Sequence, residues 1–312
     1  MESIATWYNN LLNNKELMHG ILTWLGTIFP IYVFVVTSKF TFKTIIEVIN
    51  KNKGLLLKVF LIVSVATPLI TSGIIAIFNV PLVLAGIMLI ASIAVGDPFD
   101  LVDAHGKKGS LLMASTIMIV LIALMPLTVP VWMWVFSQWF PFHLSATPVN
   151  VITHVSLVVL IPVILGLIFR QFLPKITDKL EKILKLYFLI SALLITLFFI
   201  FGSIGKIIFV FGLTGILAMF LMISSTLIMG YYVAKGLERK ERISISLACS
   251  LGNMAAVLYI ARLAYPELDK SFDFLVTVFG WVVLRWLIIY CWYFYMKYRV
   301  KREGETLEED KM

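Results

Sequence analysis

The stretch PLVLAGIMLIASIAVGDPFDLVDAHGKKG, residues 81–109, decides the fold because it begins as a membrane helix and then breaks. Its apolar first half is about fifteen residues long and reaches about 22 Å at 1.5 Å per residue, less than a bilayer-spanning helix requires. Pro98 lacks an amide hydrogen and disfavours helical geometry at Asp97, and Gly96 permits the break. We expect Asp97 to cap a second half-helix, with Pro98 at its first position and Asp100 in its first turn.

A second stretch, ISISLACSLGNMAAVLYIARL at 243–263, has a similar interruption. Gly252 can end one half-helix, and Asn253 can cap the next. Unwound backbone is tolerated at membrane depth only where it is buried in protein or lines a cavity. Two broken helices at corresponding places in two halves of a chain are typical of the binding site of a secondary transporter.

Working outward, the composition predicts a membrane protein. Of 312 residues, 60% are hydrophobic and 14% charged, whereas a soluble domain has about 25% charged residues. Nine stretches are apolar and long enough to be candidate spans: 20–38, 54–78, 81–105, 110–137, 151–173, 184–204, 207–234, 243–264 and 272–297. The sequence therefore predicts an all-α, multi-pass protein with a single transmembrane domain at 20–297. We expect its repeat halves at 20–137 and 151–297, an external segment at 1–19 and a cytoplasmic tail at 298–312.

The net charge of +8 indicates orientation. Lysine and arginine gather after the first, third, fifth and seventh stretches and in the tail, whereas the alternate connections have almost none. Positively charged loops stay in the cytoplasm, so we expect the N-terminus outside and the C-terminus inside the cell membrane. This arrangement also places the third and eighth stretches in opposite directions, as an inverted repeat requires. Because the basic residues lie in alternate loops between the apolar stretches, we expect them to set the orientation in the lipid bilayer, and we expect no nucleic-acid partner.

Other features suggest no cofactor. The two cysteines, Cys249 and Cys291, lie in apolar runs and form neither a disulfide framework nor a CxxC motif. The N-terminus lacks the cationic and apolar regions of a signal peptide. Aromatic clusters at 132–142 and 290–298 are predicted to be interfacial belts.

At these residues the chain resembles the bile acid:sodium symporter family, as a divergent, prokaryote-type member. The similarity covers about 28–295 and consists of pieces in order: IFPIYVFVVTSKFTFKTIIEVINKNKGLLLKVFLIVSVATPLI (28–70), GDPFD (96–100), GKKGSLLMASTIMIVLIALMPLTVPVW (106–132), LIPVILGLIFRQFLP (160–174) and ERISISLACSLGNMAAVLYIAR (241–262). The resemblance implies a core and a panel domain, with two discontinuous helices crossing at the substrate and ion site. It also implies that this chain is a nine-span form without the family's first helix.

The chain departs from the family pattern at both breaks. The family's Ser-Asn pair at the first break falls near Asp100 and Leu101, so the sodium-binding Asn is absent. The family's sodium-binding Glu at the second break aligns with Ser246, and its Gln aligns with Ser250. Neutral hydroxyls are weak substitutes for a carboxylate around a hard cation. These departures argue against family-type sodium coupling, and leave a proton or another cation as the coupling ion.

Three ionisable residues at membrane depth are functional candidates, because charge there is costly. Asp97 and Asp100 either supply the coupling carboxylates or cap the following half-helix. Arg285, midway along the ninth stretch, either binds an anionic substrate through its planar fork or pairs with one of those aspartates, since a buried arginine needs a partner.

These features predict a secondary transporter of a small organic anion or related metabolite, without enzymatic activity. The predicted substrate residues are Arg285, Ser250, Gly252 and Asn253; the predicted ion-coupling residues are Asp97, Asp100, Ser246 and Ser250. One alternative is a non-transporting sensor or scaffold on the same fold. An intramembrane aspartyl protease is disfavoured because its second carboxylate would have to be Asp273, near the outer boundary of the ninth stretch.

Overall fold

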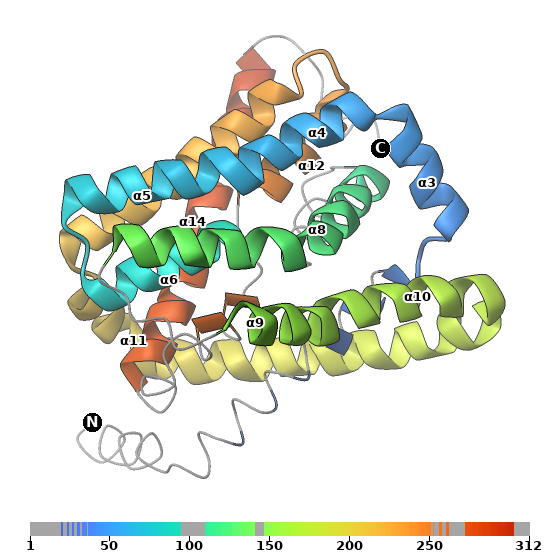
Figure 1. Cartoon of the computed structure of the whole chain (residues 1–312), viewed down its shortest axis with the longest axis horizontal. Coiled ribbons are helices and arrows are strands. Elements are labelled where there is room, and N and C mark those ends of the chain that lie inside the picture. Colours follow the sequence, from blue (N-terminus) through green and yellow to red (C-terminus); the bar gives the residue numbers. More distant parts are fainter. Residues whose placement is uncertain are drawn as a thin grey trace.

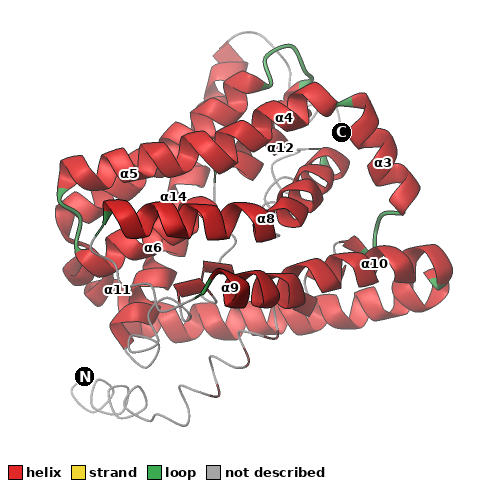
Figure 2. Ribbon diagram, viewed as in Figure 1, coloured by secondary structure: helices red, strands yellow, loops and turns green. Residues whose placement is uncertain are grey.

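The chain is helical throughout the part that the computed structural model describes (Figure 2). The described residues are 20, 24, 27, 30, 31, 33–35, 37–94, 110–140, 147–250, 252, 256, 257, 260, 261 and 272–302. Their helices are α3 (Phe42–Lys51), α4 (Lys53–Leu61), η1 (Ile62–Ala66), α5 (Thr67–Phe78), α6 (Leu82–Ile93), α8 (Leu111–Trp139), α9 (Pro148–Val155), η2 (Ser156–Leu160), α10 (Ile161–Phe172), α11 (Pro174–Val233), α12 (Arg239–Cys249) and α14 (Phe272–Arg302). The segments η1 and η2 are π-helical.

Several of these helices have the length and composition of membrane spans. Among the described residues, Lys53–Phe78, Leu112–Trp139 and Phe211–Val233 are long and apolar enough to cross a bilayer. Shorter apolar helices cover Leu82–Ile93, Ser156–Phe172 and Gly280–Met296. Large apolar side chains such as Ile77, which is 73% exposed, lie on the outer surface, as expected for lipid-facing helices. The prediction of an all-α, polytopic membrane fold is confirmed, whereas the number nine and the domain bounds stay predictions.

The helices form two groups that α11 connects (Figure 1). The first part of α11 runs beside α10, and its later part packs against α12 and α14. Between the two parts lies Gly212, with φ 60° and ψ 175°, a conformation open essentially only to glycine. The helix thus continues beyond 205–206, where the sequence predicted a connection, and breaks at Gly212.

The group around α10 is closely packed. A β-carbon at Gly166 of α10 would overlap Thr37 Oγ1 and lie 2.8 Å from the Phe34 carbonyl oxygen. Such small residues let membrane helices approach each other. At one end of this group Arg170 binds Asp178 at 2.6 Å, and Lys39 lies 3.3 Å from Glu181.

Proline distorts two helices, each just after a π-helical segment. Pro68 follows η1, and Pro162 follows η2. Pro68 has no amide hydrogen, so the Ser64 carbonyl, four residues earlier, lacks its α-helical donor. Trp132 Nε1 of α8 donates to this oxygen at 2.6 Å. Trp132 therefore joins two helices through a part-buried hydrogen bond, whereas its neighbour Trp134 is 65% exposed, and the interfacial belt stays a prediction.

Replacing Trp132 with Phe tests this contact. Trp132→Phe leaves the Ser64 carbonyl without the indole donor, and we expect a loss of about 1–3 kcal/mol in unfolding free energy. Trp134→Phe on the same helix is the matched control, with an expected change within about 0.5 kcal/mol. Reversible unfolding in mixed micelles measures both, and equal effects would show that the hydrogen bond does not stabilise the fold.

Candidate functional site at the helix breaks

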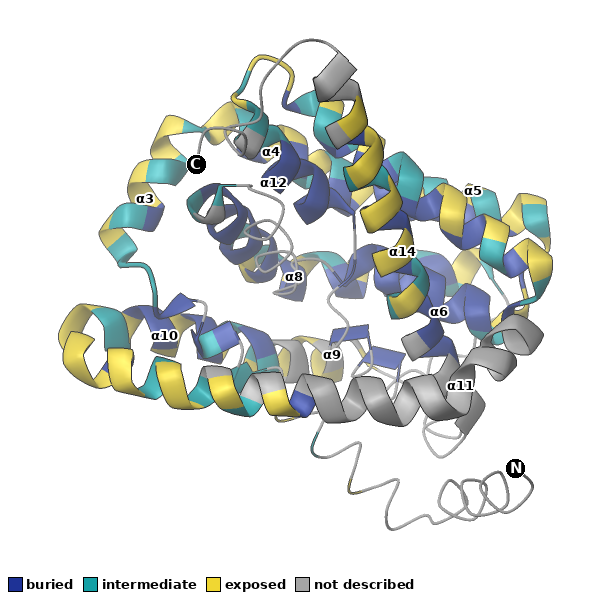
Figure 3. Cartoon of the chain, turned by 180° about the vertical axis from the view of Figure 1, so that it is seen from behind, coloured by how far each residue is buried: buried dark blue, intermediate teal, exposed yellow. Residues whose placement is uncertain are grey.

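The first break begins where α6 ends inside the protein. Every residue from Leu84 to Ile93 is buried, so protein surrounds this short helix except at its first two residues (Figure 3), as its all-round apolar sequence requires. Ala94 leaves the helical region with φ −83° and ψ 74°. The helix thus ends before Gly96. The predicted cap and coupling residues Asp97 and Asp100 lie outside the described residues.

The second break follows α12 and has the predicted glycine. The helix ends at Cys249, and Ser250 is its C-cap. Gly252 has φ +49°, a left-handed conformation that glycine adopts without the penalty of a β-carbon. The break prediction at Gly252 is confirmed, although the regular helix ends three residues earlier. Asn253, the predicted cap of the next half-helix, lies outside the described residues.

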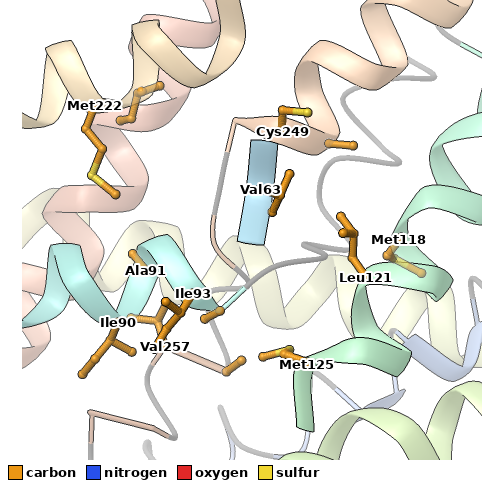
Figure 4. Packing of buried hydrophobic residues seen from close by; sticks show 14 of the residues in the cluster. Val63, Ile90, Ala91, Ile93, Met118, Leu121, Met125, Met222, Cys249 and Val257 are labelled. Carbon is orange, nitrogen blue, oxygen red and sulfur yellow. The ribbon is translucent and has the colours of Figure 1, made fainter. Parts of the chain in front are cut away.

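The ends of the two interrupted helices meet at Gly252. A β-carbon there would lie 2.9 Å from the Ala91 carbonyl oxygen of α6 and 2.8 Å from Trp281 Cη2 of α14. Ala91 and Val257, which follows the second break, also belong to one buried apolar cluster (Figure 4). The chain therefore brings its two breaks together, and Gly252 makes that close approach sterically feasible.

Arg285 lies beside this meeting point. Its side chain is 1% exposed, and its Cζ atom lies 5.9 Å from the ring centroid of Trp281, within reach of a cation–π attraction. Trp281 is one helical turn earlier on α14 and itself touches Gly252. Of the predicted substrate residues, the structure thus places Gly252 and Arg285 around the same tryptophan.

Two serines at the helix ends are buried and bonded to backbone: Ser250, a predicted residue, and Ser92, which was not predicted. Ser250 Oγ donates to the Leu247 carbonyl at 2.7 Å, and Ser92 Oγ of α6 donates to the Leu89 carbonyl at 2.6 Å. Because each hydroxyl donates its only hydrogen to backbone, its lone pairs remain as acceptors. The C-terminal ends of α6 and α12 add partial negative charge near the breaks, which favours positive over negative charge at these helix ends.

Ser246 has a more structural position than predicted. Its Oγ donates to the Leu227 carbonyl of α11 at 2.7 Å, and a β-carbon at Gly230 would lie 2.8 Å from Ser246 Cα. Ser246 therefore connects α12 to α11 through a side-chain hydrogen bond, and its alignment with the family's Glu stays a prediction. Within the described parts of the chain, no group of three His, Cys, Asp or Glu residues is placed to hold a metal ion.

Trp281, Ser92 and the Ala91 carbonyl are not among the residues predicted from the sequence. Trp281 did carry a usable indication, because it lies midway along its predicted span, whereas belt tryptophans lie at the ends of spans. The Ala91 carbonyl was not identifiable, because a backbone oxygen becomes part of a site only through the tertiary approach of Gly252.

The fold and the paired breaks define a class, that of multi-pass membrane transporters with interrupted helices. The family model described as the Sodium Bile acid symporter family matches residues 25–211, and the chain belongs to this family. The match includes the first break and ends at Phe211, so the second break lies beyond it. No curated protein sequence matches the chain. Membership confirms the resemblance and supports a transporter, and not an enzyme, in general.

Alanine at Gly252 tests the crossing. Gly252→Ala adds a β-carbon less than 3 Å from the Trp281 ring and the Ala91 oxygen, in a left-handed conformation. We expect a loss of about 2–4 kcal/mol in stability from strain and overpacking. The control is Gly73→Ala, since its β-carbon would meet nothing within 4 Å and alanine favours a helix. Thermal unfolding in detergent compares them, and a neutral Gly252→Ala would refute the close approach.

Proposed function

We propose that this protein is a secondary transporter that carries a small organic anion, or a related metabolite, across the cell membrane by alternating access. The observation that carries the proposal is the contact of Gly252 with Ala91 and Trp281, which joins the two helix breaks beside buried Arg285. Discontinuous helices of this kind form substrate and ion sites near the middle of the membrane. The loop charges support an external N-terminus and a cytoplasmic C-terminus.

Coupling to a proton or a cation is supported by the chemistry of the breaks. The C-terminal ends of α6 and α12 favour positive charge, and Ser92 and Ser250 retain acceptor lone pairs beside them. Asp97 and Asp100 would supply the carboxylates that the second break lacks in comparison with the family pattern. Family membership fits sodium as the ion, whereas the Glu-to-Ser246 difference favours protons.

Arg285 has two roles consistent with its position. As a substrate residue, it would bind the carboxylate of an organic anion through its planar guanidinium. As a structural residue, it would pair with Asp97 or Asp100 and hold α14 against the first break. Both roles make a positive charge at this position necessary for transport.

A second candidate is a non-transporting sensor or scaffold. Ser246 favours it, because its hydroxyl is committed to the Leu227 carbonyl in place of a coupling carboxylate. In a sensor, ligand binding would persist without net uptake.

Uptake by proteoliposomes tests transport and coupling together. A panel of labelled organic anions that includes the bile acid cholate is used as substrate. We expect the accumulation of at least one of them to change when a pH gradient is imposed. Asp97→Asn should abolish this response because a neutral amide cannot carry the proton, whereas Asp103→Asn near the cytoplasmic end should retain it. Uptake that depends strictly on sodium would overturn the proton assignment. Ligand binding without uptake would favour the sensor.

Removing the buried charge tests Arg285. We expect Arg285→Ala to abolish uptake, and to lower the unfolding free energy by about 3–5 kcal/mol if it breaks a buried ion pair. In the Arg285→Ala background, a second change, Asp97→Asn, should restore part of the unfolding free energy if Asp97 is the partner, because it removes the carboxylate charge that has lost its arginine. The control is Arg302→Ala, at the end of the same helix. An Arg285→Ala protein that folds and transports normally would refute both roles.

A further inference from the structure

Trp281 has a buried hydrogen-bond donor for which the described residues offer no acceptor. Its side chain is 0% exposed, and within the described parts of the chain its indole Nε1 has no hydrogen-bond partner. An indole nitrogen can only donate, and a buried donor left unsatisfied destabilises the fold. Buried tryptophans usually find a partner for this group. A tryptophan that only fills space at this position therefore carries an energetic cost that phenylalanine would avoid.

Trp281 approaches the helix crossing through its six-membered ring. Its Cη2 and Cζ2 atoms lie 2.8 and 2.9 Å from the position of a β-carbon at Gly252. In an indole, Cζ2 is bonded to the carbon that carries Nε1. The N–H group is thus two bonds away from an atom that touches the meeting point of the two breaks.

A second donor group lies close to it. The Arg285 guanidinium carbon is 5.9 Å from the Trp281 ring, one helical turn further along α14. The Ala91 carbonyl oxygen is within 2.9 Å of the same Gly252 position. The crossing therefore combines an acceptor oxygen from the end of α6 with side chains of α14 that carry N–H donors.

We propose that Trp281 Nε1 is a substrate-binding donor, which hydrogen-bonds the carboxylate of the transported organic anion next to Arg285. This inference rests on the proposed function, and adds to it a specificity residue and the carboxylate as the recognised group. A carboxylate suits the position because it is an acceptor-only group with two oxygens, and N–H bonds to ionised acceptors are the stronger ones. The substrate would then satisfy the donor that the protein itself leaves unsatisfied.

The test is Trp281→Phe, which removes the N–H group and retains an aromatic ring. The control is Trp286→Phe, on the same helix and 39% exposed. Melting temperatures of the purified full chain in detergent are measured without ligand, and then with cholate, benzoate or their uncharged methyl esters. Without ligand, Trp281→Phe should melt below Trp286→Phe, because the smaller ring leaves a cavity at a fully buried position, so each variant is judged by the rise in its own melting temperature when ligand is added. The Kd of any carboxylate that stabilises the wild type should rise about tenfold, or about 1.4 kcal/mol, with no such change for the control.

Three results would overturn the inference. If Trp281→Phe binds carboxylates as tightly as the wild type, the N–H group does not contact the substrate, and the proposed transport function stands. If Trp281→Phe weakens the binding of the methyl esters as much as that of the carboxylates, the loss comes from changed packing, and the N–H group does not recognise the carboxylate. If the wild type binds the carboxylates no better than their methyl esters, carboxylate recognition fails, together with the organic-anion part of the proposed function.

Discussion

Backbone polar groups cannot be left in contact with lipid, and this constraint governs the whole arrangement. A helix can end at membrane depth only if protein surrounds the end. The twelve-residue α6 meets this requirement because ten consecutive residues, Leu84 to Ile93, are buried. The same constraint explains the glycine at position 252. The chain after α12 must come close to the end of α6 to cover it, and only a residue without a β-carbon fits there. Helices α5, α8, α11 and α14 then contact α6 and enclose the site.

The crossing combines groups of opposite polarity. The ends of α6 and α12 have carbonyl oxygens and serine hydroxyls, and α14 contributes Trp281 and Arg285. In the proposed transporter, a cation and an organic anion bound here would partly neutralise each other, and each would lower the electrostatic cost of holding the other at membrane depth. This reciprocity is the physical basis for coupling two ligands in one carrier, and it does not require the family's Glu at the position of Ser246.

The structure was easiest to predict from the sequence where a local backbone conformation requires one residue type. Gly252 was predictable because glycine followed by a polar cap marks a helix end, and the apolar composition alone indicated a multi-pass fold. The role of Ser246 in fastening α12 to α11 was not predictable, because it depends on the Leu227 carbonyl nineteen residues away in the chain. The same holds for Trp132, whose acceptor at Ser64 exists through Pro68 in another helix. Tertiary partners of this kind leave no local pattern in a single sequence.

The break at Gly212 has a mechanical consequence for the rest of the chain. A β-carbon at Gly212 would meet nothing within 4 Å, so the surrounding side chains do not clamp this point. The segment Phe211–Val233 that follows it has 23 residues and is about 34 Å long at 1.5 Å per residue. A turn of about 10° at Gly212 would move the far end of this segment by about 6 Å. Because α12 and α14 pack on the segment, a change of backbone torsion at one glycine would displace the helices at the crossing.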